Sequence, residues 1–219
     1  MRVLAEAALR IGRMAAVLGV MGLAGCMAPR PAGMPLEAGA APGRDVIART
    51  LAGRPREVKR SITGEIFARG ERIKVTGMLD FHGSLDFRLS LAMVGGPGLF
   101  DGRYDWAGIH LRSCSPGFDD RVAVAMIEDV SMALREPRSL EGLDAAEHVT
   151  LLRVTGGDAV EFTYEFAGAQ GALRRLTVMR GPFDGLEVQF PGYEARGWPK
   201  GMTLYRPAYG YSAEFTFGQ

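Results

Sequence analysis

The sequence predicts a mainly β fold of the α+β class, an incomplete antiparallel β-barrel of about eleven strands. Three observations predict it. Apolar and polar residues alternate with a period of two through most of residues 62–217, as in strands that bury one face. Short segments containing glycine and aspartate separate these runs, as in hairpin connections. Two segments have helical spacing, and two helices are too few to cover a flat sheet of this length, so the sheet must curl around its apolar face.

A short helix is expected first, over Arg44 to Ala52. Val46, Ile47 and Leu51 are spaced to share one helical face. The segment 53–55 reads Gly-Arg-Pro and ends the helix, because glycine and proline do not continue it.

The strands follow this helix. The clearest alternation places Leu85, Phe87, Leu89 and Leu91 on one face of a single strand. The expected strands are 62–67, 75–81, 85–91, 100–106, 109–113, 149–154, 159–166, 173–179, 186–190, 202–205 and 211–217.

A mid-chain helix interrupts the strands and is expected to close the cavity of the half-barrel. It spans Arg121 to Leu134, and either Asp119 or Asp120 can cap its N-terminus. Pro137 prevents it from continuing. Its apolar face is expected to contain Val122, Met126 and Val130.

The N-terminus has the features of a secretion signal. Arg2, Arg10 and Arg13 give a positive region that is followed by an apolar run over residues 14–22, too short to cross a bilayer. The run ends in Leu-Ala-Gly-Cys at positions 23–26, which resembles the lipobox of bacterial lipoproteins. This resemblance implies cleavage after residue 25 and acylation of the Cys26 thiol. The alternative is an ordinary secretory signal with a cysteine present by chance.

Three regions follow from this interpretation: a signal peptide (1–25), a flexible tether (26–43) and a folded domain (44–219). The tether is predicted from its alanine, proline and glycine content. Acyl chains on Cys26 would hold the protein on a membrane. Met27 follows the cysteine where an aspartate would retain a lipoprotein in the inner membrane, so the resemblance implies the outer membrane, facing the periplasm.

Composition excludes several classes of function. The formal net charge is +1, so no basic field for nucleic acid is expected. Cys114 is the one cysteine besides Cys26, and we expect an unreactive or buried thiol there. We expect a monomer.

From Arg44 to Gln219, the order of helix, strands, mid-chain helix and further strands resembles the LolA/LolB family of lipoprotein carriers and receptors. Val94 to Phe100 is similar to a glycine- and proline-containing loop of the LolB-type receptor, and Tyr193 to Met202 is similar to the last segment of the family. The lipobox points to the membrane-anchored LolB-type receptor.

The resemblance implies a lipid-handling protein that is not an enzyme. Its partners would be membrane lipid, through the acylated N-terminus, and a periplasmic lipoprotein carrier. Leu99 and Phe100 would form a tip that contacts the membrane, the alternative being that they pack as the start of the next strand. The residues expected to line the lipid cavity are Leu85, Phe87, Leu89, Leu91 and Met126. The competing hypothesis is a lipid-anchored structural or interaction module of the envelope that transfers no lipid.

The remaining reactive side chains predict no catalytic, cofactor or metal site. His82, His110 and His148 are scattered without further ligands at metal-binding spacing. Glu128 and Asp129 are interpreted as solvated charges on a helix face. Trp106 and Trp198 suit either a membrane interface or a buried core, and buried aromatic residues are the commoner case.

Overall fold

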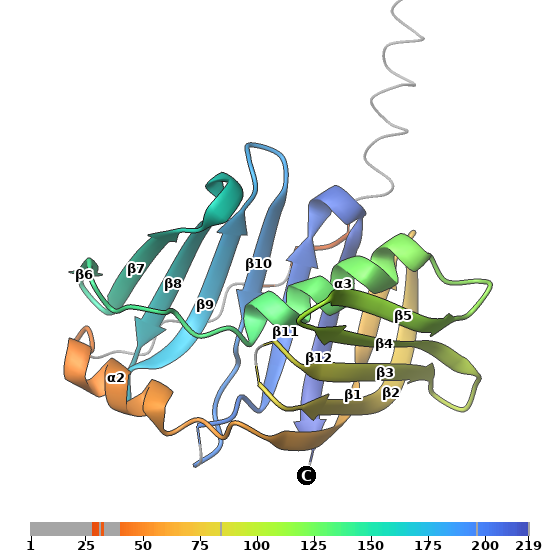
Figure 1. The fold of residues 1–219 in the computed structure, drawn as a ribbon, viewed down its shortest axis with the longest axis horizontal. Coiled ribbons are helices and arrows are strands. Elements are labelled where there is room, and N and C mark those ends of the chain that lie inside the picture. The colour runs from red at the N-terminus through yellow and green to blue at the C-terminus, as the bar shows by residue number, and fades with distance from the viewer. Residues whose placement is uncertain (1–27, 31, 33–39, 84, 196, 219) are drawn as a thin grey trace, which may run out of the picture.

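The computed structural model describes residues 28–30, 32, 40–83, 85–195 and 197–218. These residues form one antiparallel sheet of twelve strands and two α-helices (Figure 1). The strands are β1 (Val58–Ala68), β2 (Glu71–Phe81), β3 (Phe87–Met93), β4 (Gly98–Asp105), β5 (Gly108–Cys114), β6 (Leu143–Ala145), β7 (Val149–Thr155), β8 (Glu161–Ala167), β9 (Ala172–Met179), β10 (Gly185–Gln189), β11 (Gly201–Arg206) and β12 (Tyr211–Gly218). The helices are α2 (Arg44–Ala52) and α3 (Asp120–Ala133), and the 3-10 turns are η1 (Gly157–Ala159) and η2 (Pro207–Tyr209).

The sheet joins two meanders at its centre. Its order is β5-β4-β3-β2-β1-β12-β11-β10-β9-β8-β7-β6, and the pairing of β1 with β12 places Ile62 opposite Phe217. Strands β5 and β6 are the two edges, and within the described residues no pairing joins them. The prediction of a mainly β, open antiparallel fold with two helices is therefore confirmed. The extra strand is β6, whose three residues are too few to show an alternating pattern.

The alternation seen in the sequence sorts side chains between two faces. In β12 the buried positions are Tyr211, Ala213, Phe215 and Phe217, with less buried residues between them. The sheet curls so that these buried faces point inward, and α3 lies across the inside (Figure 1). The apolar core is therefore a layer between the sheet and α3.

Two glycines on the buried face allow close packing. A Cβ on Gly77 in β2 would overlap the carbonyl oxygen of Ser90 in β3, so the two backbones approach closely at this point. A Cβ on Gly102 in β4 would overlap the Ile127 side chain of α3. The first glycine permits this close approach of β2 and β3, and the second permits α3 to lie against the sheet.

Both helices occur where the sequence predicts them. Helix α2 has the expected bounds, and it buries Ile47 and Leu51. Helix α3 lies within one residue of its expected bounds at each end, and the Asp119 carboxylate caps it by accepting a hydrogen bond from the Arg121 N–H at 2.9 Å. Pro137 lies beyond the end of the helix.

The described residues of the segment predicted as a tether lie against the domain. Ala28 is buried. The Arg30 guanidinium donates two hydrogen bonds to the Glu187 carboxylate in β10, at 3.1 and 2.7 Å. The Thr150 hydroxyl in β7 donates to the carbonyl oxygen of Pro42 at 2.7 Å. Both ends of the described part of this segment therefore contact the sheet.

Candidate functional site

Most of the residues predicted to line a lipid cavity meet in the core. Phe87, Leu89 and Leu91 alternate along the buried face of β3, Met126 lies on α3, and their exposed fractions are 0–3%. Leu85 does not join them, because β3 begins at Phe87 and Leu85 lies in the preceding connection with 52% of its surface exposed. The alternating pattern extended the strand two residues too far.

The membrane-contacting tip predicted at Leu99 and Phe100 is not present. Each side chain is 2% exposed, and both lie in β4. The register explains how two consecutive residues are buried: Leu91 pairs with Phe100 while Ala92 pairs with Gly98, which leaves Leu99 as the extra residue of a bulge. The alternative, that these residues pack as the start of a strand, is the one observed.

Helix α3 is held against the sheet by a buried polar cluster. Asp129 in α3 is 0% exposed, and its carboxylate accepts hydrogen bonds from the Arg206 guanidinium and the Tyr211 hydroxyl. Arg206 is 1% exposed and also donates to the Asp184 carboxylate at 2.9 and 3.0 Å. Beside this cluster, Arg180 pairs with Glu128 at 2.8 Å. The middle of α3 is thus fixed to β11, β12 and the connection between β9 and β10.

The interpretation of Asp129 as a solvated charge is wrong. Asp129 lies seven residues after Val122 and three after Met126, which places it on the apolar face of the same helix. Helical periodicity was therefore the signal that would have identified Asp129 as a buried carboxylate. The arginine that pairs with it lies 77 positions further along the chain.

Burial sets the protonation of this cluster. It raises the pKa of Asp129 to about 6, although Arg206 and the hydrogen bond from Tyr211 oppose the shift. Burial by itself lowers the pKa of Arg206, but the Asp129 and Asp184 carboxylates raise it above its ordinary value, so the guanidinium stays charged.

This shift predicts a pH dependence of stability. The unfolded pKa of an aspartate is about 3.9, so the contribution of Asp129 is fully present below that pH and is lost as the pH rises through about 6. We expect the free energy of unfolding of the natural protein to fall by about 2 kcal/mol relative to Asp129→Asn between pH 4 and pH 7. Urea denaturation at four pH values would measure this difference, and parallel curves for the two proteins would contradict it.

Other carboxylates titrate in a lower pH range. A hydrogen bond from Arg88 lowers the pKa of Asp101, and backbone N–H groups lower the pKa values of Asp105 and Asp119. Their stabilisation is lost only as the pH falls below their unfolded values, and it is common to both proteins in the comparison.

A small cavity opens beside the C-terminal half of α3. It has a volume of about 200 Å³ and lies between the helix, β4 and the β7–β8 region. We call it the mouth, and its lining residues are Tyr104, Glu128, Ser131, Met132, Arg135, Gly156, Gly157, Val160, Phe162 and Arg180. Because ligand pockets typically measure roughly 300–1,000 Å³, a lipid chain would need α3 to shift before it could enter the core from here.

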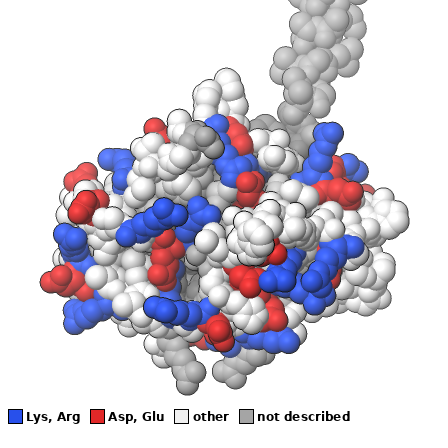
Figure 2. Space-filling view, viewed as in Figure 1, with Lys and Arg blue, Asp and Glu red and all other residues white. Residues whose placement is uncertain are grey.

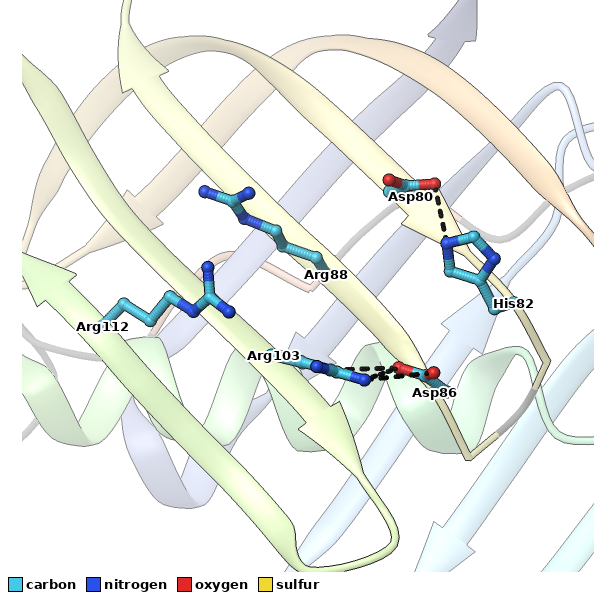
Figure 3. A pocket seen from close by; sticks show the side chains of 6 residues that line it. All are labelled: Asp80, His82, Asp86, Arg88, Arg103 and Arg112. Atoms are coloured by element: carbon cyan, nitrogen blue, oxygen red, sulfur yellow. Dashed lines mark hydrogen bonds and ion pairs between the residues drawn. The ribbon is translucent and has the colours of Figure 1, made fainter.

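A second cavity, of about 310 Å³, lies on the opposite face of β2–β5 and is lined by charged side chains (Figure 3). Arg88 and Arg103 are directly opposed in the β3–β4 register. They turn to different carboxylates: Arg88 donates to Asp101 at 2.8 and 2.6 Å, and Arg103 donates to Asp86 at 3.1 and 3.2 Å. With Asp80, His82 and Arg112 also lining it, this hollow holds both signs of charge. Sequence reasoning did not find it, because the cluster depends on strand register.

Charges of both signs are also mixed over the face shown in Figure 2, with uncharged surface between them. Each histidine lies near a carboxylate, His82 near Asp80, His110 near Asp105 and His148 near Glu147. Among the described residues no group of three potential ligands is placed to hold a metal ion.

Cys114 and the tryptophans singled out in the sequence differ in their exposure to solvent. Cys26 lies outside the described residues. Cys114 is half-buried, and burial raises the pKa of its thiol to about 11, so it is protonated and unreactive at neutral pH. Trp198 is buried, whereas Trp106 is 91% exposed in the turn between β4 and β5.

Neither described helix is long and apolar enough to cross a bilayer. No family model matches the chain, and no curated protein matches it significantly.

Proposed function

We propose that this chain is a lipid-anchored protein of the bacterial outer membrane that binds acyl chains, free or on lipoproteins, between its curled sheet and α3. The observation that carries the proposal is that α3 covers the apolar inner face of the sheet. The apolar face of a twelve-stranded open sheet meets a helix of 14 residues, and the mouth beside that helix is lined in part by Tyr104, Met132, Val160 and Phe162. The lipobox resemblance at Cys26 supplies the anchor.

The energetics of exchange support a reversible binding site. Each methylene buried contributes about 0.8 kcal/mol, so eight methylenes contribute about 6 kcal/mol. Exposing a large apolar side chain costs about 1.5–3 kcal/mol, so displacing Met126, Ile127 and Val130, all buried on α3, costs a similar amount. The two contributions are of similar size, so an acyl chain can replace these helix contacts with a small net change in free energy as long as the Asp129–Arg206 pair stays intact.

We expect Val160→Glu to weaken fatty-acid binding about tenfold or more, because it places a carboxylate in the mouth. The measurement is saturable fluorescence of a fatty-acid probe. The matched control is Val124→Glu, since Val124 lies on the exposed side of α3 and is not among the mouth residues. Equal weakening by both variants would remove the mouth from the mechanism, and absence of saturable binding by the natural protein would end the proposal.

The second candidate is an anchored interaction module that transfers no lipid. The filled interior favours it, because Phe87, Leu89, Leu91 and Met126 are buried within the protein's own core. The charged hollow on the outer face of β2–β5 would then be the contact for a polar partner. The fatty-acid titration separates the two candidates directly.

A further inference from the structure

Two exposed aromatic side chains lie at one end of the sheet. Phe183, in the connection between β9 and β10, is 89% exposed, and Tyr209, in η2 between β11 and β12, is 41% exposed. The two connections lie at the same end (Figure 1), and the hydrogen bonds from Arg206 to Asp184 join them. A phenylalanine this exposed leaves a large apolar area in water with no described residue covering it.

Residues 28–30, which follow Cys26 closely in the sequence, are docked near this end. Arg30 is bound to Glu187 through two hydrogen bonds, and Ala28 beside it is buried. Arg30 comes four positions after Cys26, a length of chain that spans at most about 14 Å. Glu187 comes four positions after Phe183 along the hairpin, at most about 13 Å of extended chain.

We propose that the end of the sheet formed by the β9–β10 connection and η2 rests on the phospholipid bilayer, with Phe183 and Tyr209 among the lipid headgroups and upper acyl chains. The inference rests on the proposed function for the acyl anchor at Cys26. A membrane is the occupant because the short chain from Cys26 to Arg30 holds this end within reach of the anchoring surface. Tyrosine is enriched at membrane interfaces, and phenylalanine is among the apolar residues that interfacial segments bury at the boundary of the acyl chains.

A single reporter tests this orientation. Phe183→Trp in a Trp106→Phe background places one exposed tryptophan at the proposed contact, and the buried Trp198 is common to all samples. The full chain, purified from bacterial membranes, is reconstituted into vesicles of phosphatidylethanolamine and phosphatidylglycerol with brominated acyl chains. The matched control is the natural protein, whose exposed Trp106 lies in the β4–β5 turn, on a different part of the sheet.

We expect the Phe183→Trp reporter to be strongly quenched by the brominated lipid and several-fold less accessible to aqueous iodide than Trp106. A reporter that iodide reaches as readily as Trp106, with no quenching by lipid, would overturn the proposal. Arg30→Ala should reduce the lipid quenching of the reporter by releasing the docked segment, and unchanged quenching would overturn the role given to that segment. Fatty-acid binding is measured separately, so failure of the proposed acyl site and failure of this orientation give different results.

Discussion

Replacing Arg206 with methionine is expected to lower the free energy of unfolding by about 3–5 kcal/mol. The substitution leaves the Asp129 carboxylate buried at 0% exposure without its cationic partner, and it also removes the hydrogen bonds to Asp184. An uncompensated charge in the interior costs far more than the ion pair contributes, because desolvation is no longer offset. Urea denaturation at neutral pH measures the loss.

The double variant Asp129→Leu with Arg206→Met is the control for this prediction. It removes both buried charges together, and we expect it to recover most of the stability lost in Arg206→Met, since apolar replacements of a buried pair are often neutral. Asp184 is partly exposed and can be solvated when Arg206 is gone. If Arg206→Met alone lowers the free energy of unfolding by less than about 1 kcal/mol, water reaches Asp129 and the cluster does not fix α3.

The second large effect is expected from Gly77→Ala. Its Cβ would overlap the carbonyl oxygen of Ser90, a backbone atom that cannot rotate away, so β2 and β3 must separate. Overpacking of this kind typically costs about 1–3 kcal/mol, and we expect the upper end of that range, visible as a lower melting temperature.

Gly98→Ala is the matched control for that substitution. Gly98 begins β4, and no atom lies within 4 Å of its Cβ position, so this variant should be neutral or slightly stabilising. If the two alanine variants melt at the same temperature, the close approach of β2 and β3 does not limit the fold.

Periodicity predicted the fold well because it reports which face of a strand or helix is buried. It located both helices and eleven of the twelve strands in the described residues. It failed where a local rule was broken, at the bulge that buries Leu99 beside Phe100 and at the turn that exposes Leu85. Leu85 continues the alternation of Phe87 and Leu89, and Leu99 is apolar like its neighbour Phe100. The alternating pattern therefore could not reveal the turn or the bulge.

The candidate site was less predictable because its parts come from distant segments. The pairing of Asp129 with Arg206 and Tyr211 spans about a third of the chain, and it depends on how α3 crosses the sheet. The same holds for the mouth, where Tyr104 meets Met132 and Phe162. Sequence spacing predicts which side chains face inward, but the strand order decides which of them meet.

The two unpaired edges of the sheet have a mechanical consequence. Within the described residues no ladder of hydrogen bonds joins β5 to β6, so a change in the twist of the open sheet would widen or tighten it without breaking any strand pairing. A closed barrel has a radius set by its strand number and stagger, whereas strand pairing does not fix the radius of this open sheet, and the packing of α3 against its inner face is what would resist a change. A change in interior volume would therefore cost side-chain packing while the backbone pairing stays intact.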